Sequence, residues 1–171
     1  MLVIPLLAVL CSLLGSSCRQ TTVCHVYHSL PERGWSRGDT LTFHIDLPDS
    51  GGVCYRMFVD VRNRNDFPHP DLLLCLQMSR DETETYRSST EILPHFIDTL
   101  RLALANERGV WTGKGWGGLY QNRFYAGTVC TDRAGAFTLK MVYAHSDTLL
   151  RGVNDVGIRI EKLSLKPRDD E

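Results

Sequence analysis

Residues 55–62 read Tyr55-Arg56-Met57-Phe58-Val59-Asp60-Val61-Arg62. Apolar and charged residues alternate along this stretch, and Phe58 is the one departure. A period of two is typical of a β-strand that buries one face and exposes the other. The same period recurs in four further segments, which are residues 41–47, 100–104, 137–141 and 156–161. The chain is therefore predicted to be mainly β.

Turn-forming residues separate these segments, at 48–52, 63–70, 113–118 and 132–135. No segment keeps the 3.6-residue period of an amphipathic helix. The one candidate for a short helix is residues 87–95. About eight short strands with such turns predict one all-β domain, an antiparallel β-sandwich or jelly roll, over residues 39–166. Residues 72–76 are continuously apolar, which predicts a strand buried on both faces. Residues 167–171 form a charged tail.

Composition narrows the function classes. The chain has 171 residues, of which 43% are hydrophobic and 23% charged, with a formal net charge of -1. These values are close to globular averages, which argues against wholesale disorder. Near-neutrality argues against nucleic acid as a partner, because nucleic-acid binders present a basic face.

The N-terminal segment differs from everything after it. Residues 1–17 carry no charge and end in small residues, as in a secretory signal peptide. Its last residues, together with the cysteine that follows, read Gly15-Ser16-Ser17-Cys18 and resemble a bacterial lipoprotein signal. In such a signal Cys18 becomes the lipidated first residue. The alternative is a plain secretory signal with Cys18 as an ordinary thiol. Residues 18–38 are then predicted to hold the lipidated cysteine and a tether or first strand. Some lipoproteins that are exported to the cell surface carry an acidic run just after the lipidated cysteine. No such run follows Cys18, which favours a position facing the periplasm.

Four cysteines remain in the predicted mature domain, namely Cys24, Cys54, Cys75 and Cys130. Export permits disulfides, but four cysteines allow three pairings and the sequence does not choose among them. Buried free thiols at Cys54 and Cys75 are the alternative. No C-x-x-C pair occurs, so neither a zinc ribbon nor a thioredoxin-type site is indicated.

Three further motifs each have a functional and a structural interpretation. Residues 113–118 match G-x-G-x-x-G, but their flanks resemble strands, which predicts a glycine-rich turn or bulge instead of a nucleotide site. Residues 63–70 are interpreted as a shaped connection with ion pairs among Arg62, Arg64 and Asp66, and a cation or partner loop using Asp60, Asp66 and Asp71 is the alternative. The histidines fit neither HExxH nor zinc spacing, and no catalytic triad signature occurs. We therefore predict no metal, no cofactor and no catalytic residue.

Large aromatic residues are the remaining candidates for a ligand or partner surface. They are Trp35, Trp111, Trp116, Phe124 and Tyr125. Aromatic rings can stack on sugars, which gives an envelope carbohydrate-binding module as the rival function. The structural alternative is that these rings form core.

Several stretches together resemble the gliding-motility lipoprotein H (GldH) family of Bacteroidetes. They are the signal ending at Cys18, residues 34–41, 59–68, 98–100 and 111–115, and the closing 155–162. The resemblance implies an envelope lipoprotein anchored through Cys18, on the outer membrane facing the periplasm. It also implies an accessory or scaffolding role in gliding motility or type IX secretion, with other motility lipoproteins as partners. It implies no catalytic residues, and only Cys18 carries over as a functional position.

Overall fold

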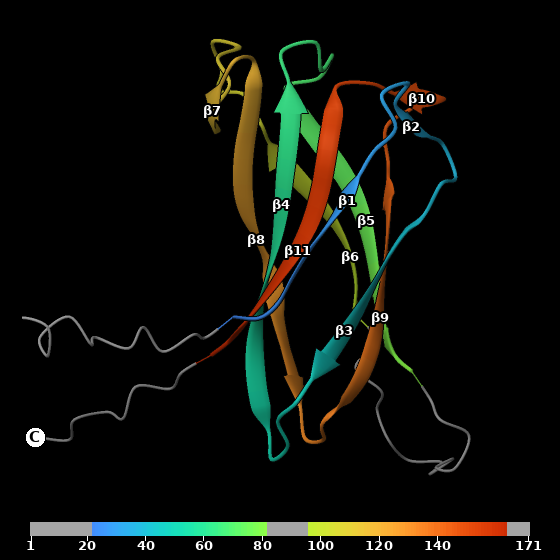
Figure 1. Ribbon diagram of the computed structural model, residues 1–171, viewed down its shortest axis with the longest axis vertical. Helices are drawn as coiled ribbons and strands as arrows, with labels where there is room; N and C mark the ends of the chain where they lie inside the picture. The colour runs from blue at the N-terminus through green and yellow to red at the C-terminus, as the bar shows by residue number, and fades with distance from the viewer. Residues whose placement is uncertain (1–21, 82–95, 164–171) are drawn as a thin grey trace, which may run out of the picture.

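A computed structural model describes residues 22–81 and 96–163 of the chain (Figure 1). Cys18 and the helix considered at residues 87–95 lie outside the described residues. Within the described part, no helix is long and apolar enough to cross a membrane. Eleven strands are described: β1 Thr22–Ser29, β2 Trp35–Ser36, β3 Leu41–Leu47, β4 Val53–Arg64, β5 Asp71–Arg80, β6 Phe96–Ala103, β7 Lys114–Trp116, β8 Leu119–Thr131, β9 Gly135–Tyr143, β10 Leu149–Leu150 and β11 Val153–Lys162.

The strands form two principal antiparallel sheets that face each other (Figure 1). One sheet has the order β1-β11-β4-β8-β7 and the other β3-β9-β5-β6, while β2 and β10 make a separate two-residue pair. The predicted all-β sandwich is confirmed. Strands that follow one another in the sequence often belong to different sheets, so most pairings join residues far apart in the chain.

The core lies between the inner faces of the two sheets. Tyr55, Met57, Val59 and Val61 of β4 are at most 1% exposed, and the inward residues of β5 and β9 are also buried. Burying each such side chain stabilises the fold by about 1.5–3 kcal/mol. The alternation read from the sequence therefore corresponds to the sandwich core.

Phe58, the residue that departed from the alternation, causes no break in β4. It points away from the core, and β8 carries a bulge opposite it, since Met57 pairs with Gly127 and Phe58 with Tyr125. Ala126 is the extra residue of the bulge. The Phe58 ring packs edge-on against Tyr125, with centroids 5.9 Å apart. An apolar residue in the polar register is thus covered by its cross-strand neighbour.

The first strand lies within the segment predicted to be a tether or first strand: β1 begins at Thr22 and is paired along its length with β11. One expectation from the sequence needs correction. The apolar run 72–76 is not buried on both faces, because Leu73 and Cys75 are only half-buried. One face of β5 packs against the other sheet, and its opposite face is the outside of the sandwich.

The cysteine pairing that the sequence left open is resolved by the register of β4 and β8. Cys54 and Cys130 lie directly opposite each other and form a disulfide. Cys24 and Cys75 are free and half-buried.

The glycine-rich segment 113–118 is a turn between strands, as predicted. Gly117 and Gly118 have φ of 63° and 83° and link β7 to β8. A Cβ on Gly115 would lie 2.1 Å from the Leu119 carbonyl oxygen, so only glycine allows this close backbone approach. A strand follows the turn where a nucleotide site would need a helix.

Candidate functional site

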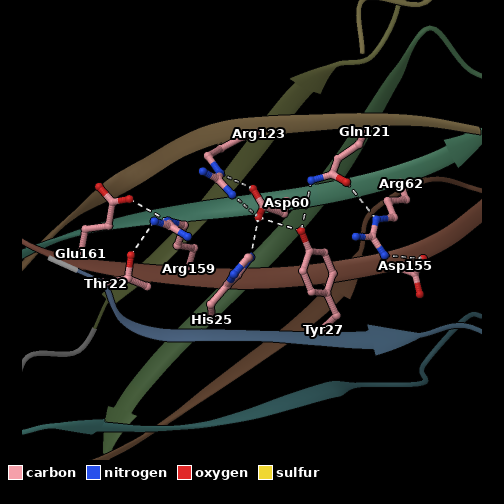
Figure 2. Close-up of polar contacts among 10 residues, drawn as sticks. All are labelled: Thr22, His25, Tyr27, Asp60, Arg62, Gln121, Arg123, Asp155, Arg159 and Glu161. Atoms are coloured by element: carbon pink, nitrogen blue, oxygen red, sulfur yellow. Dashed lines mark hydrogen bonds and ion pairs between the residues drawn. The ribbon is translucent and has the colours of Figure 1, made fainter. Parts of the chain in front are cut away.

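The outer surface of the five-stranded sheet carries an ordered set of charged side chains, shown in Figure 2. Cross-strand pairing sets them in rows, because residues opposite each other in neighbouring strands share a face. We call this surface the charged face, and it comprises Arg56, Asp60 and Arg62 of β4, Arg123 of β8, and Asp155, Arg159 and Glu161 of β11. His25 and Tyr27 of β1 border it.

Asp60 occupies the centre of the charged face and is fully buried, although it points away from the core. Arg123 donates from Nε to Oδ1 (2.6 Å) and from Nη2 to Oδ2 (2.9 Å). The Tyr27 hydroxyl donates to Oδ2 at 2.9 Å, and His25 Nε2 lies 3.0 Å from the same oxygen. Because an ionised carboxylate only accepts, His25 donates from Nε2. Four hydrogen bonds thus surround one carboxylate.

These contacts decide the charge state of Asp60. Burial alone raises the pKa of the carboxyl group, but the hydrogen bonds from Arg123, Tyr27 and His25 outweigh it, and the pKa lies below its ordinary value. Asp60 is therefore ionised at neutral pH. Its oxygens are already occupied, so it offers no free base or nucleophile.

A glycine lets Tyr27 reach Asp60 across the intervening strand. Gly157 of β11 lies between them in the row, and a Cβ there would stand 2.6 Å from the Tyr27 ring. The ring consequently lies over β11 and its hydroxyl reaches the carboxylate. The Arg62 guanidinium covers the ring, 4.6 Å from its centroid.

The neighbouring rows repeat the same arrangement of acid and base. Arg62 bonds Gln121 from Nε (3.0 Å) and lies 3.6 Å from Asp155. Arg159 donates from Nε to Glu161 at 2.6 Å, and Arg56 reaches the other oxygen of Glu161 at 3.3 Å. Each carboxylate of the charged face is therefore paired with at least one arginine.

The predicted aromatic residues do not form one surface. Trp35 is only 1% exposed and donates from Nε1 to the Asp39 carbonyl, so its ring belongs to the core. Trp111 and Phe124 are partly buried against the core. Trp116 and Tyr125 are 94% and 59% exposed, and both lie on the side of the sheet that carries the charged face. Of the five aromatic candidates, two, Trp116 and Tyr125, therefore lie on an accessible face.

The segment 63–70 is a shaped connection, as interpreted, but Arg62 pairs with Asp155 of β11 and not with Asp66. Arg64 binds Asp66 with two bonds of 3.0 Å. Asp60, Asp66 and Asp71, the alternative cation ligands, do not converge, because each is paired with a different arginine, namely Arg123, Arg64 and Arg101 respectively.

A cluster that no sequence pattern indicated lies at one end of the sandwich. His69, His145 and Asp147 place ligand atoms within 4.8 Å of one another. However, His145 Nε2 accepts the Leu73 amide hydrogen (3.0 Å), and His69 Nε2 lies 2.9 Å from Asp147. The two rings stack at 4.3 Å with a 16° interplanar angle. Imidazole lone pairs lie in the ring plane, so nearly parallel rings cannot both point at one ion. We interpret the cluster as structural.

This cluster predicts a pH dependence of stability. Burial, and secondarily the neighbouring His69, hold the pKa of His145 below its ordinary value, against the opposing charges of Asp71 and Asp147. Below about pH 6.5 the unfolded chain therefore binds more protons at this position than the folded chain, and acid destabilises the fold. We expect the urea midpoint to fall between pH 7.5 and 5.5.

His145→Gln should reduce that fall, since a Gln carbonyl oxygen can still accept from Leu73 without titrating. His44→Gln, at an exposed position of β3, is the matched control and should leave the pH slope unchanged. An identical slope in His145→Gln and the unsubstituted chain would contradict the assignment.

The fold and the charged face together define an all-β sandwich domain whose distinguishing surface is a network of paired charges. A family model, GldH lipoprotein, matches residues 22–160, and the chain belongs to this family. The resemblance inferred from the sequence is confirmed.

Relatives and solved structures give further comparisons. A gliding motility lipoprotein GldH homolog of Christiangramia forsetii is 28% identical over 158 residues, covering 88% of this chain and 90% of the relative. The gliding motility lipoprotein GldH of Flavobacterium johnsoniae is 27% identical, covering 90% and 92% respectively. Among solved structures, a tomato aspermy virus chain aligns over 98% of this chain and 97% of its own length at 16% identity. Its TM-score of 0.34 is too low to support an argument.

Proposed function

We propose that this protein is a lipid-anchored component of the gliding-motility or type IX secretion machinery that acts through protein contacts. Its family and the names of its relatives support the motility assignment. The observation that carries the contact role is the charged face, an ordered surface whose central carboxylate is saturated by hydrogen bonds. Such a surface is preorganised for binding, and it offers no free catalytic group at Asp60.

The proposed anchor lies close to the fold. Cys18 is four residues before Thr22, so the connecting chain spans at most about 14 Å. Thr22 pairs with Glu161, at the end of the sheet opposite Trp116. A lipid on Cys18 would therefore hold that end of the sandwich near the bilayer. We propose that this bilayer is the outer membrane and that the domain faces the periplasm.

The anchor predicts a localisation phenotype. Cys18→Ala should abolish palmitate labelling and release the domain from the membrane fraction, because acyl chains on that residue supply the attachment. Cys24→Ala is the matched control and should keep both label and localisation. Equal labelling of Cys18→Ala and the unsubstituted protein would refute lipidation at this residue.

The contact role is tested by crosslinking and affinity purification of the anchored protein from its own host. The Cys18→Ala form serves as the soluble control. We expect other envelope proteins to be retained with the anchored form and their abundance to fall when this protein is deleted. Retention of no envelope protein would refute the proposal.

Exposed Trp116 supports a second candidate function, an envelope glycan-binding module. Retention on a polysaccharide column that is lost in Trp116→Ala would favour it, and absence of retention would remove it.

A further inference from the structure

Acidic and basic groups of the charged face lie at different depths. The carboxylates are underneath: the side chains of Asp60, Asp155 and Glu161 are 0%, 8% and 15% exposed. Three of the arginines that pair with them stand above: Arg56, Arg62 and Arg123 are 45%, 36% and 40% exposed. A partner approaching this surface therefore meets guanidinium groups, although acids and bases nearly balance in number.

The exposed guanidiniums keep donors for a partner. Arg123 uses Nε and Nη2 on Asp60, and Arg62 uses Nε on Gln121. A guanidinium carries five N–H donors, so each of these arginines retains others. The bonds from below also fix the position of each group, which lowers the side-chain entropy lost on binding.

From this arrangement we infer that the charged face docks an acidic, extended segment of a protein partner. The inference rests on the proposed contact function and names the chemistry that the partner presents. Planar guanidinium groups match carboxylates with paired hydrogen bonds. Tyr125 and Trp116 flank the arginines with exposed rings, and Arg, Tyr and Trp dominate the binding energy of protein interfaces.

The spacing of the rows fits an extended chain. Outward residues along β4, such as Asp60 and Arg62, are two positions apart, which is about 6.8 Å in an antiparallel strand. Alternate side chains of an extended segment have the same separation. Acidic residues at every second position can therefore meet successive rows of the charged face.

One observation favours a protein over the bilayer. Exposed Trp116 lies in the same row as Arg64, whereas Thr22, near the proposed anchor, lies in the row of Arg56. The two rows are eight residues apart along β4, or about 27 Å. An aromatic anchor at the membrane interface would be expected near the lipidated end.

The test uses site-specific photo-crosslinking in the anchored, full-length protein in its own host. The crosslinking amino acid p-benzoylphenylalanine replaces Tyr125, and in a parallel strain it replaces Thr99, an exposed residue on the outer side of the four-stranded sheet. We expect a protein adduct at position 125 and none at 99. Mass spectrometry should locate the adduct in a segment rich in Asp and Glu.

Charge dependence provides the second readout. Arg56→Gln with Arg62→Gln should lower the yield of the position-125 adduct about tenfold, since two charge-assisted contacts are lost. Lys140→Gln with Arg101→Gln removes the same charge from the opposite side of the sandwich and should leave the yield unchanged. Raising the ionic strength should lower the yield in the chain that keeps all its arginines, a measurement that does not depend on how a variant folds.

Each other outcome overturns the inference. An adduct to lipid would assign the charged face to the membrane, and an adduct to residues 164–171 would assign it to the chain's own acidic terminus. A yield that ignores both the arginine substitutions and salt would exclude carboxylate recognition. A protein adduct at Thr99 but not at 125 would refute this docking face and leave the proposed contact function standing. Absence of a protein adduct at both positions, together with an affinity purification that retains no envelope protein, would refute the contact function itself.

Discussion

Asp60→Ala is expected to lower the free energy of unfolding by about 3 kcal/mol, near the lower end of the range for breaking a buried ion pair. The substitution removes the acceptor for Arg123, Tyr27 and His25 at once. The cost is not larger because the Arg123 side chain is 40% exposed and can be hydrated again. Urea unfolding of the soluble Cys18→Ala chain measures the difference.

Asp66→Ala is the matched control for this substitution. Asp66 also receives two bonds from one arginine, Arg64, but it is 60% exposed, and exposed pairs contribute about 0–1 kcal/mol. Similar losses in the two variants would show that burial of Asp60 adds nothing.

Acid titration provides a second measurement of the Asp60 contribution. Its pKa is lowered in the fold, so its stabilisation is present at neutral pH and is lost as the pH falls through the folded value. Asp60→Asn should therefore flatten the stability curve below about pH 4.

Removing the Cys54–Cys130 disulfide is expected to cost about 4.5 kcal/mol in the chain-entropy treatment of cross-links. The two cysteines are 76 residues apart, so the cross-link restricts a large loop of the unfolded chain. The double variant Cys54→Ala, Cys130→Ala should show this loss in urea unfolding, and its stability should no longer respond to a reductant.

Cys24→Ala with Cys75→Ala is the control for that experiment. Both thiols are free and half-buried, so their loss should cost much less and leave the response to reductant intact. A control that loses as much stability as the disulfide variant would contradict the role given to the cross-link.

Much of the fold could be predicted because burial on one side of a strand leaves a period of two in the sequence. Tyr55, Met57, Val59 and Val61 show this directly, since the same residues are apolar in the sequence and buried in the core. Trp35 shows the limit of such reasoning. Its indole ring is equally suited to a surface or a core, and only its position between the sheets, with Nε1 bonded to the Asp39 carbonyl, decides the matter.

Sequence patterns did not predict the charged face. Asp60 occupies a polar position in the alternation, and the functional alternative for it was a loop that binds cations or partners. Its donors come from positions 33 to 63 residues away, on strands β1 and β8. A local pattern carries no record of such contacts, because they depend on which strands become neighbours and in which register.

By itself the sequence determined that this chain is a β-sandwich with a lipoprotein-like N-terminus, and its motifs pointed to the GldH lipoprotein family. These properties can be predicted from local periodicity and from short segments of adjacent residues. The tertiary structure alone decided the Cys54–Cys130 pairing, the burial of Asp60 and the placement of arginines above carboxylates. Each of those depends on strand order and register, which bring together residues that the sequence keeps far apart.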